Sequence, residues 1–119
     1  LHMQLARPER PLPVTAPQWR HNGGGLDYPL PCRVFADPIE AWFHLDRMQS
    51  AGQPFNFVLA GGRMYCLARR AQGRLTPPAW MAAPAWYEMA GGVTTFRRAD
   101  FDALDAAAVA AALAAARPG

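Results

Sequence analysis

Phe55-Asn56-Phe57-Val58-Leu59-Ala60-Gly61-Gly62-Arg63-Met64-Tyr65-Cys66-Leu67-Ala68 is the stretch that decides the fold. Two apolar runs separated by two glycines are typical of a β-hairpin with a two-residue turn. If Ala60 pairs with Arg63, one face is wholly apolar and belongs to the core. The expected apolar pairs are Leu59 with Met64, Phe57 with Cys66, and Phe55 with Ala68. The other face carries Asn56, Val58, Arg63 and Tyr65, and it could touch a ligand or another protein.

The segment before this hairpin carries a helix start. Asp37-Pro38-Ile39-Glu40 supplies an acidic N-cap, a proline in the first turn and a glutamate three residues after the cap. The helix should run from Pro38 to about Ala51 and stop at Gly52, which tolerates a left-handed backbone. We expect Ala41, Trp42, Leu45 and Met48 to face inward.

The remaining segments are less regular. Prolines and a triple glycine make residues 7–31 a looping connection, with a short strand at Leu12-Pro13-Val14 or an edge strand at Cys32-Arg33-Val34-Phe35. Residues 91–96 should form a strand, and Asp100 or Asp105 should cap a final alanine-rich helix over residues 106–116. The chain is thus expected to be a single α+β domain over residues 1–119, with a mainly antiparallel sheet and two helices.

Composition excludes several classes of protein. Every apolar run is shorter than the ~20 residues that span a bilayer, so no membrane role is expected, and the expected location is the cytoplasm. The net charge is +3, carried by scattered arginines without a basic stripe, which makes nucleic acid an unexpected partner. Cys32 and Cys66 are predicted to be reduced and buried. Two cysteines and three separated histidines predict no metal site and no cofactor.

The three histidines differ in context. His44 is expected on the solvated side of the helix, and His21 precedes a glycine run that is best explained as an ordinary loop, although such a loop can receive an anion. His2 lies in an alternating segment in which His2 and Gln4 point the same way from a strand.

Leu1-His2-Met3-Gln4, followed by Leu12-Pro13-Val14, resembles the His-x-His-x-Gln signature of one branch of the histidine triad superfamily. That branch includes galactose-1-phosphate uridylyltransferase, diadenosine tetraphosphate phosphorylase and the GDP-hexose phosphorylases. The hairpin and the segment from Tyr65 to Arg70 are similar to strands of the phosphorylases' C-terminal region, and residues 86–92 take the place of their Gly-rich segment. The chain departs from the pattern at Ala68, where the family has proline, and it lacks the first histidine of the motif.

The resemblance implies a HIT-like fold and nucleotidyl transfer through a covalent nucleotidyl-histidine. His2 would be the nucleophile and Gln4 would stabilise the charge on the phosphate oxygens. Arg69, Arg70 and Asn56 would bind the phosphate or nucleotide. The substrate would be a nucleoside polyphosphate or a nucleotide sugar. The chain would be the C-terminal portion of a longer two-part protein, inactive in isolation and partnered by the missing N-terminal half or a second chain.

Three alternatives remain open. The chain could be an interaction or nucleotide-binding domain with no activity of its own, using exposed aromatic residues as a contact surface. The residues expected in that surface are Trp19, Trp80, Trp86 and Tyr87. Tyr65 and Arg63 could bind single-stranded nucleic acid, although a basic groove is missing. Finally, His2-Met3 could be a remnant of cloning.

Overall fold

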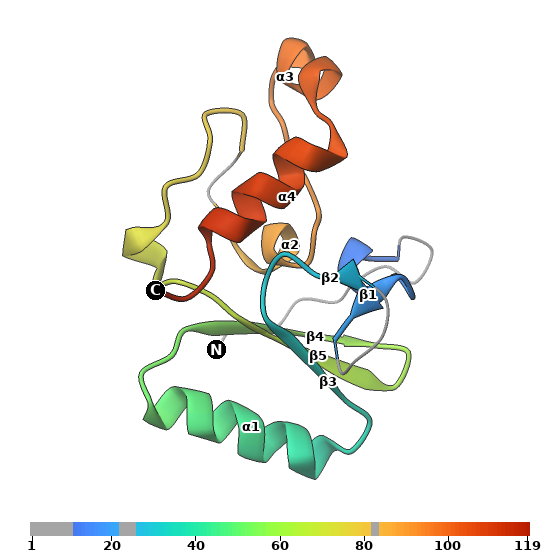
Figure 1. Ribbon diagram of the computed structural model, residues 1–119, viewed down its shortest axis with the longest axis vertical. Coiled ribbons are helices and arrows are strands. Elements are labelled where there is room, and N and C mark those ends of the chain that lie inside the picture. The colour runs from blue at the N-terminus through green and yellow to red at the C-terminus, as the bar shows by residue number, and fades with distance from the viewer. Residues whose placement is uncertain (1–10, 22–25, 82–83) are drawn as a thin grey trace.

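The computed structural model describes residues 11–21, 26–81 and 84–119 of the chain (Figure 1). The elements, in chain order, are a 3₁₀ turn Pro13–Thr15, β1 Trp19–Arg20, β2 Leu26–Asp27, β3 Cys32–Phe35, α1 Pro38–Ser50, β4 Phe55–Ala60, β5 Arg63–Ala68, a 3₁₀ turn Gln72–Arg74, α2 Trp86–Met89, α3 Arg98–Ala103 and α4 Ala106–Ala115. The mixed α+β class is as expected. The described residues contain four helices rather than the two that the sequence predicted.

The hairpin of β4 and β5 is the centre of an antiparallel sheet with strand order β3-β5-β4. Ala60 pairs with Arg63 and the register continues to Phe55 and Ala68, which confirms the predicted pairing. Gly61 and Gly62 have φ values of 56° and 73°, and two consecutive positive φ angles define the turn type that matches the twist of a hairpin. The predicted edge strand at residues 32–35 is also confirmed, because β3 pairs with β5 only.

Helix α1 covers one face of this sheet (Figure 1). The Asp37 carboxylate accepts a hydrogen bond from the Ile39 amide at 2.9 Å, and Gly52 follows the helix with φ of 69°, so both predicted ends are confirmed. Leu45 and Met48 are buried against the sheet, but Trp42 is 67% exposed, contrary to our expectation. Neighbouring helix residues are about 100° apart around the axis. A stripe centred on Ala41, Leu45 and Met48 therefore leaves Trp42 at its side.

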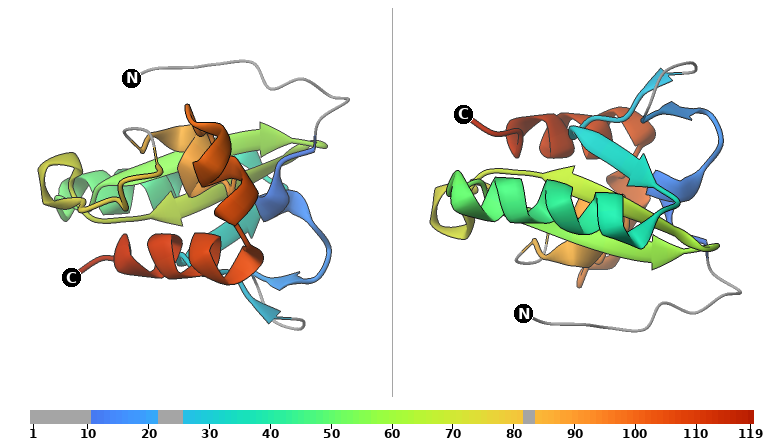
Figure 2. Two further views of the ribbon diagram at one scale, coloured as in Figure 1. Left: turned by 90° about the horizontal axis from the view of Figure 1, so that it is seen from above. Right: turned by 90° about the horizontal axis from the view of Figure 1, so that it is seen from below.

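The opposite face of the sheet carries the larger core, so most of it is covered and is not available to a partner. Val58 is 4% exposed, Tyr65 is 8% exposed and Leu67 is fully buried. The face is covered by residues 12–21 and 26–30, by α2 and by α4, so the sheet lies between two layers (Figure 2). The main contributors to this cover are Leu12, Val14, Tyr28, Leu30, Met89, Ala90 and Leu113. Arg63, at the hairpin end of this face, is exposed, and Asn56 near the other end is partly exposed.

Two segments predicted as strands have other structures. Leu12-Pro13-Val14 leads into a 3₁₀ turn, whose Val14 amide donates to the Ala90 carbonyl at 2.9 Å. Residues 91–96 contain no strand, because Gly91 follows the end of α2 with φ of 96° and packs so close to Pro13 that it leaves no room for a side chain. A Cβ atom at Gly91 would lie 2.7 Å from Pro13 Cβ. The turn therefore depends on a contact with a distant segment, which strand propensity does not register.

In the C-terminal region the structure confirms one predicted helix cap, at Asp105, and contains one helix, α3, that the sequence did not predict. The Asp105 carboxylate accepts a hydrogen bond from the Ala108 amide at 2.7 Å, so Asp105 rather than Asp100 caps α4. Asp100 lies inside α3, which the sequence did not predict. Within the described part of the chain, no helix is long and apolar enough to cross a bilayer.

The two cysteines are free and buried, as predicted. Cys32 lies opposite Leu67 in the sheet while Cys66 lies opposite Arg33, so the two thiols point to opposite faces. Burial raises the pKa of Cys32 to about 12 and that of Cys66 to about 11.

We expect a thiol reagent such as dithiobis-nitrobenzoate to leave both cysteines of the native protein unmodified at pH 8. At that pH only about one Cys66 thiol in a thousand is ionised, and the thiolate is the reactive form. Absorbance of the released thiol should show two reacting groups after denaturation in guanidinium. Rapid reaction of either cysteine before denaturant is added would contradict the burial of these strands.

Candidate functional site

A cavity of about 500 Å³ opens beside the hairpin end of the sheet. Its walls come from residues 15–21, from the end of β3, and from Arg63 and Tyr65 of β5. We call it the Tyr65 groove. Its volume lies in the range of small-molecule sites, which is about 300–1,000 Å³.

The sheet and the N-terminal coil position the groove residues by different means. Arg63 and Tyr65 are two residues apart on β5 and therefore share a face, and Val34 of β3 pairs with Tyr65. On the coil, the Trp19 indole donates to the Pro13 carbonyl at 2.8 Å. The groove is thus formed where segments far apart in the sequence meet.

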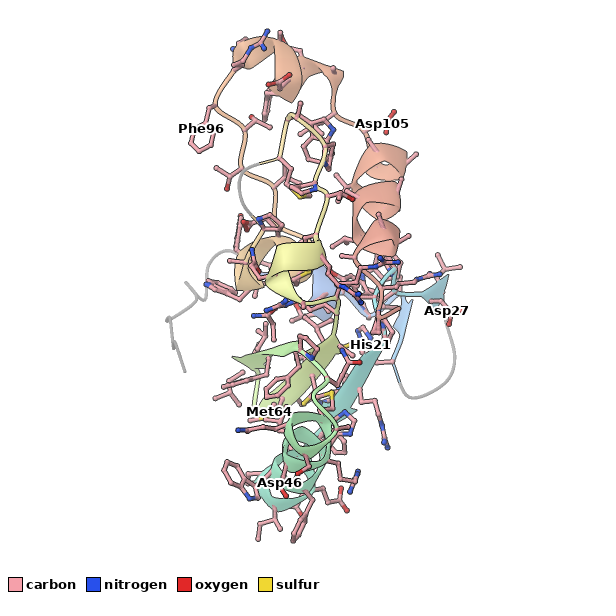
Figure 3. All side chains as sticks on the ribbon, turned by 90° about the vertical axis from the view of Figure 1, so that its left-hand side faces the viewer. His21, Asp27, Asp46, Met64, Phe96 and Asp105 are labelled. Atoms are coloured by element: carbon pink, nitrogen blue, oxygen red, sulfur yellow. The ribbon has the colours of Figure 1, made fainter. Side chains whose placement is uncertain are left out.

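His21 is the functional candidate that the sequence analysis did not select. Its Nε2 lies 2.8 Å from the Val14 carbonyl oxygen, and because a carbonyl only accepts, Nε2 carries the proton. Its Nδ1 is buried and has no hydrogen-bond partner among the described residues. The ring meets Tyr65 edge-on at a centroid distance of 5.7 Å, on the side of the sheet opposite Met64 and α1 (Figure 3). Nothing in the linear sequence signals this contact.

Tyr28 connects Trp19 and His21, two residues that line the groove, to the core. Its hydroxyl donates to the Met89 carbonyl at 2.6 Å, and burial raises the pKa of Tyr28. The Tyr28 ring contacts both Trp19, at 5.3 Å, and His21, at 5.9 Å between centroids. The rings around the groove are therefore held by one packed cluster.

The groove favours an anion. Arg63 is exposed and is the one residue with a permanent charge among the described residues that line it, and no carboxylate is present in that lining. The Thr15 hydroxyl, which also lines the groove, donates to the Leu12 carbonyl at 2.8 Å. A guanidinium at the mouth of a partly apolar cavity suits a phosphate or carboxylate group.

Arg69 and Asn56, two of the predicted phosphate-binding residues, contact each other, but they lie away from the Tyr65 groove. Arg69 Nε donates to Asn56 Oδ1 at 2.6 Å and Arg69 Nη1 donates to the Arg70 carbonyl at 2.7 Å. The Gln53 amide donates to the Arg69 carbonyl at 2.7 Å, and burial lowers the pKa of Arg69. These bonds join the outer ends of β4 and β5. Arg69 follows Arg63 by six residues, about 20 Å along a strand, so it lies at the far end from the Tyr65 groove.

Arg70 has a structural partner in the C-terminal segment. Its Nε donates to the Arg117 carbonyl at 2.9 Å, and Arg117 Nε donates in turn to the Pro29 carbonyl at 2.6 Å. The other predicted site residues, His2 and Gln4, lie outside the described residues.

The exposed aromatic surface in the structure differs from the one that the sequence predicted. Trp19, Trp80 and Trp86 are partly buried, and only Tyr87 of that set is exposed, at 39%. The exposed apolar side chains of α1 are instead Ile39, Trp42 and Phe43.

Within residues 11–21, 26–81 and 84–119, no group of three histidine, cysteine or acidic side chains could hold a metal ion. The fold and the groove define the chain as a small α+β domain with an anion-compatible cavity at one end of its sheet. Comparisons with protein-family models, with curated proteins and with solved structures found no match.

Proposed function

We propose that the chain is the C-terminal part of a HIT-like nucleotidyltransferase or nucleotide phosphorylase that uses a covalent nucleotidyl-histidine. The observation that carries the proposal is His2-Met3-Gln4, taken together with the hairpin of β4 and β5. The hairpin supports it because the run Phe55-Asn56-Phe57-Val58-Leu59, which resembles a phosphorylase strand in sequence, lies in a strand here. The substrate is a nucleoside polyphosphate or a nucleotide sugar.

The chemistry consists of two displacements at the α-phosphorus. In the first, a ring nitrogen of neutral His2 attacks phosphorus, an N–P bond forms, and the P–O bond to the second phosphate breaks with its electron pair on the departing phosphate or hexose phosphate. In the second, phosphate or a sugar phosphate attacks the nucleotidyl-histidine, the N–P bond breaks, and His2 is regenerated. Such transfers rely on positioned donors and charge more than on acid–base groups.

Gln4 is the donor that this proposal places beside His2. Its side-chain amide would donate to the non-bridging oxygens, whose charge must be stabilised in the transition state. Arg69 and Asn56 stay candidates for phosphate binding, although Arg69 must then bind with donors other than those used for Asn56 and Arg70. The five donors of a guanidinium allow this sharing.

The test is covalent trapping in the protein encoded by the complete reading frame. A nucleotide sugar or diadenosine tetraphosphate labelled at the α-phosphorus is added without an acceptor. We expect acid-labile label on the peptide that contains His2, and no label after His2→Ala. The matched control is His44→Ala, which removes a helix histidine outside the proposed site and should leave the label unchanged. Label that persists in His2→Ala would overturn the assignment.

A non-catalytic interaction domain is the second candidate, and the surface of α1 favours it. Ile39, Trp42 and Phe43 are 64%, 67% and 58% exposed, and three large apolar groups at helical spacing form a stripe that a partner could cover. This candidate predicts that the protein binds a partner or a nucleotide without forming any covalent label.

A further inference from the structure

The geometry points to the Tyr65 groove as the place where a nucleoside phosphate binds, with its phosphate on Arg63 and its base among the aromatic walls. This inference goes beyond the proposed function, because the groove lies about 20 Å from the Arg69-Asn56 pair and is therefore a second phosphate site. Its choice of a nucleotide rests on that function. The groove residues themselves were identified from contacts in the fold and not from the resemblance.

The first step is charge. Arg63 begins β5 directly after the Gly61-Gly62 turn and is exposed. Unlike those of Arg69 and Arg70, its guanidinium makes no hydrogen bond to another residue in the part of the chain that the structure describes. Arginine pairs with phosphate oxygens through two parallel N–H bonds. No described carboxylate in the groove lining competes for it.

The second step is the shape and chemistry of the walls. The half-buried Trp19 and the largely buried Tyr65 line the groove, and Pro17 and Val34 add apolar surface. Flat heteroaromatic bases stack on such rings with little dependence on base identity. A cavity of about 500 Å³ is large enough for a ligand of this class.

The third step is the unpaired acceptor of His21. Because Nε2 donates to the Val14 carbonyl, Nδ1 carries the lone pair, and no described residue donates a hydrogen bond to it. The exocyclic amines and ring N–H groups of purines are donors of the kind that would satisfy it. Since Nδ1 is buried, the His21 ring must turn slightly toward the groove when the base enters, and this movement is itself measurable.

The experiment is a titration of the isotopically labelled chain with GMP or AMP, followed by the backbone amides of the groove residues and the ring nitrogens of His21. Guanosine alone and inorganic phosphate alone are separate arms. We expect the monophosphate to shift the signals of Arg63, Tyr65 and the His21 Nδ1, and to bind at least about 10-fold more tightly than either fragment.

Arg63→Gln should weaken monophosphate binding at least about 10-fold. The matched control is Arg47→Gln, which removes an exposed arginine from α1 on the other side of the sheet and should change nothing. Both positions are exposed, so both variants should unfold at the wild-type temperature. Equal affinities in the two variants, shifts confined to other regions, or guanosine binding as tightly as GMP would overturn the inference.

The two proposals fail separately. If His2 is labelled but the groove residues show no signal change on titration, the binding-site inference is refuted and the nucleotidyltransferase proposal stands. A responding groove without any His2 label would refute covalent catalysis and retain the binding site.

Discussion

Replacing His2 by alanine in the protein encoded by the complete reading frame is expected to lower kcat for phosphorolysis of a nucleotide sugar by at least about 10⁴-fold. Loss of a covalent nucleophile removes the intermediate itself, and such losses in other enzymes reach about 10⁶-fold. Binding of the substrate should change little, because Arg69 and Asn56, the candidates for phosphate binding, are untouched. Steady-state rates and equilibrium binding, measured on the same preparation, check this expectation.

Gln4→Ala supplies the graded comparison for the same site. Loss of one positioned donor to a charged oxygen typically lowers kcat by about 10²–10³-fold, so this variant should retain more activity than His2→Ala. His44→Ala should turn over at the wild-type rate. Robust turnover by His2→Ala would show that the nucleophile is elsewhere or that the reaction is a direct displacement.

Leu67→Ala is expected to lower the free energy of unfolding by about 3–5 kcal/mol. Leu67 is fully buried at the centre of the larger core, on the strand that has neighbours on both sides. Truncation there leaves a cavity between the sheet and its covering layer, and the lost contacts add to the lost apolar transfer. Since domains of this size have a stability of about 5–15 kcal/mol, the variant should be marginally folded.

Urea denaturation followed by tryptophan fluorescence measures this loss. Leu59→Ala is the matched control, because Leu59 lies on the neighbouring strand β4 but is 58% exposed. We expect that control to cost less than about 1 kcal/mol. Equal losses in the two variants would contradict the assignment of the larger core to the face that bears Tyr65 and Leu67.

The parts of the fold that local chemistry determines were predicted well. The register of β4 and β5 follows from a two-residue turn that requires two glycines. The bounds of α1 follow from the Asp37 cap and from Gly52, whose effects reach no further than one helical turn. The candidate nucleophile His2 and its neighbour Gln4 also come from a linear pattern, and their roles stay predictions.

Other features depend on which segments meet. The alternation along β4 and β5 defines two faces, but it is the packing of residues 12–21, residues 26–30, α2 and α4 that makes the Tyr65 face a core. The same packing turns residues 91–96 away from strand geometry. It also brings His21 against Tyr65 to form the groove.

The sequence by itself determined the Gly61-Gly62 turn, the Asp37 cap and the register of β4 and β5, because those depend on backbone conformations that a residue and its near neighbours allow or forbid. Tertiary structure alone decided which surfaces are covered and that Asn56 is the partner of Arg69. Burial and long-range hydrogen bonds join residues that are distant in the chain, and no local preference encodes that meeting.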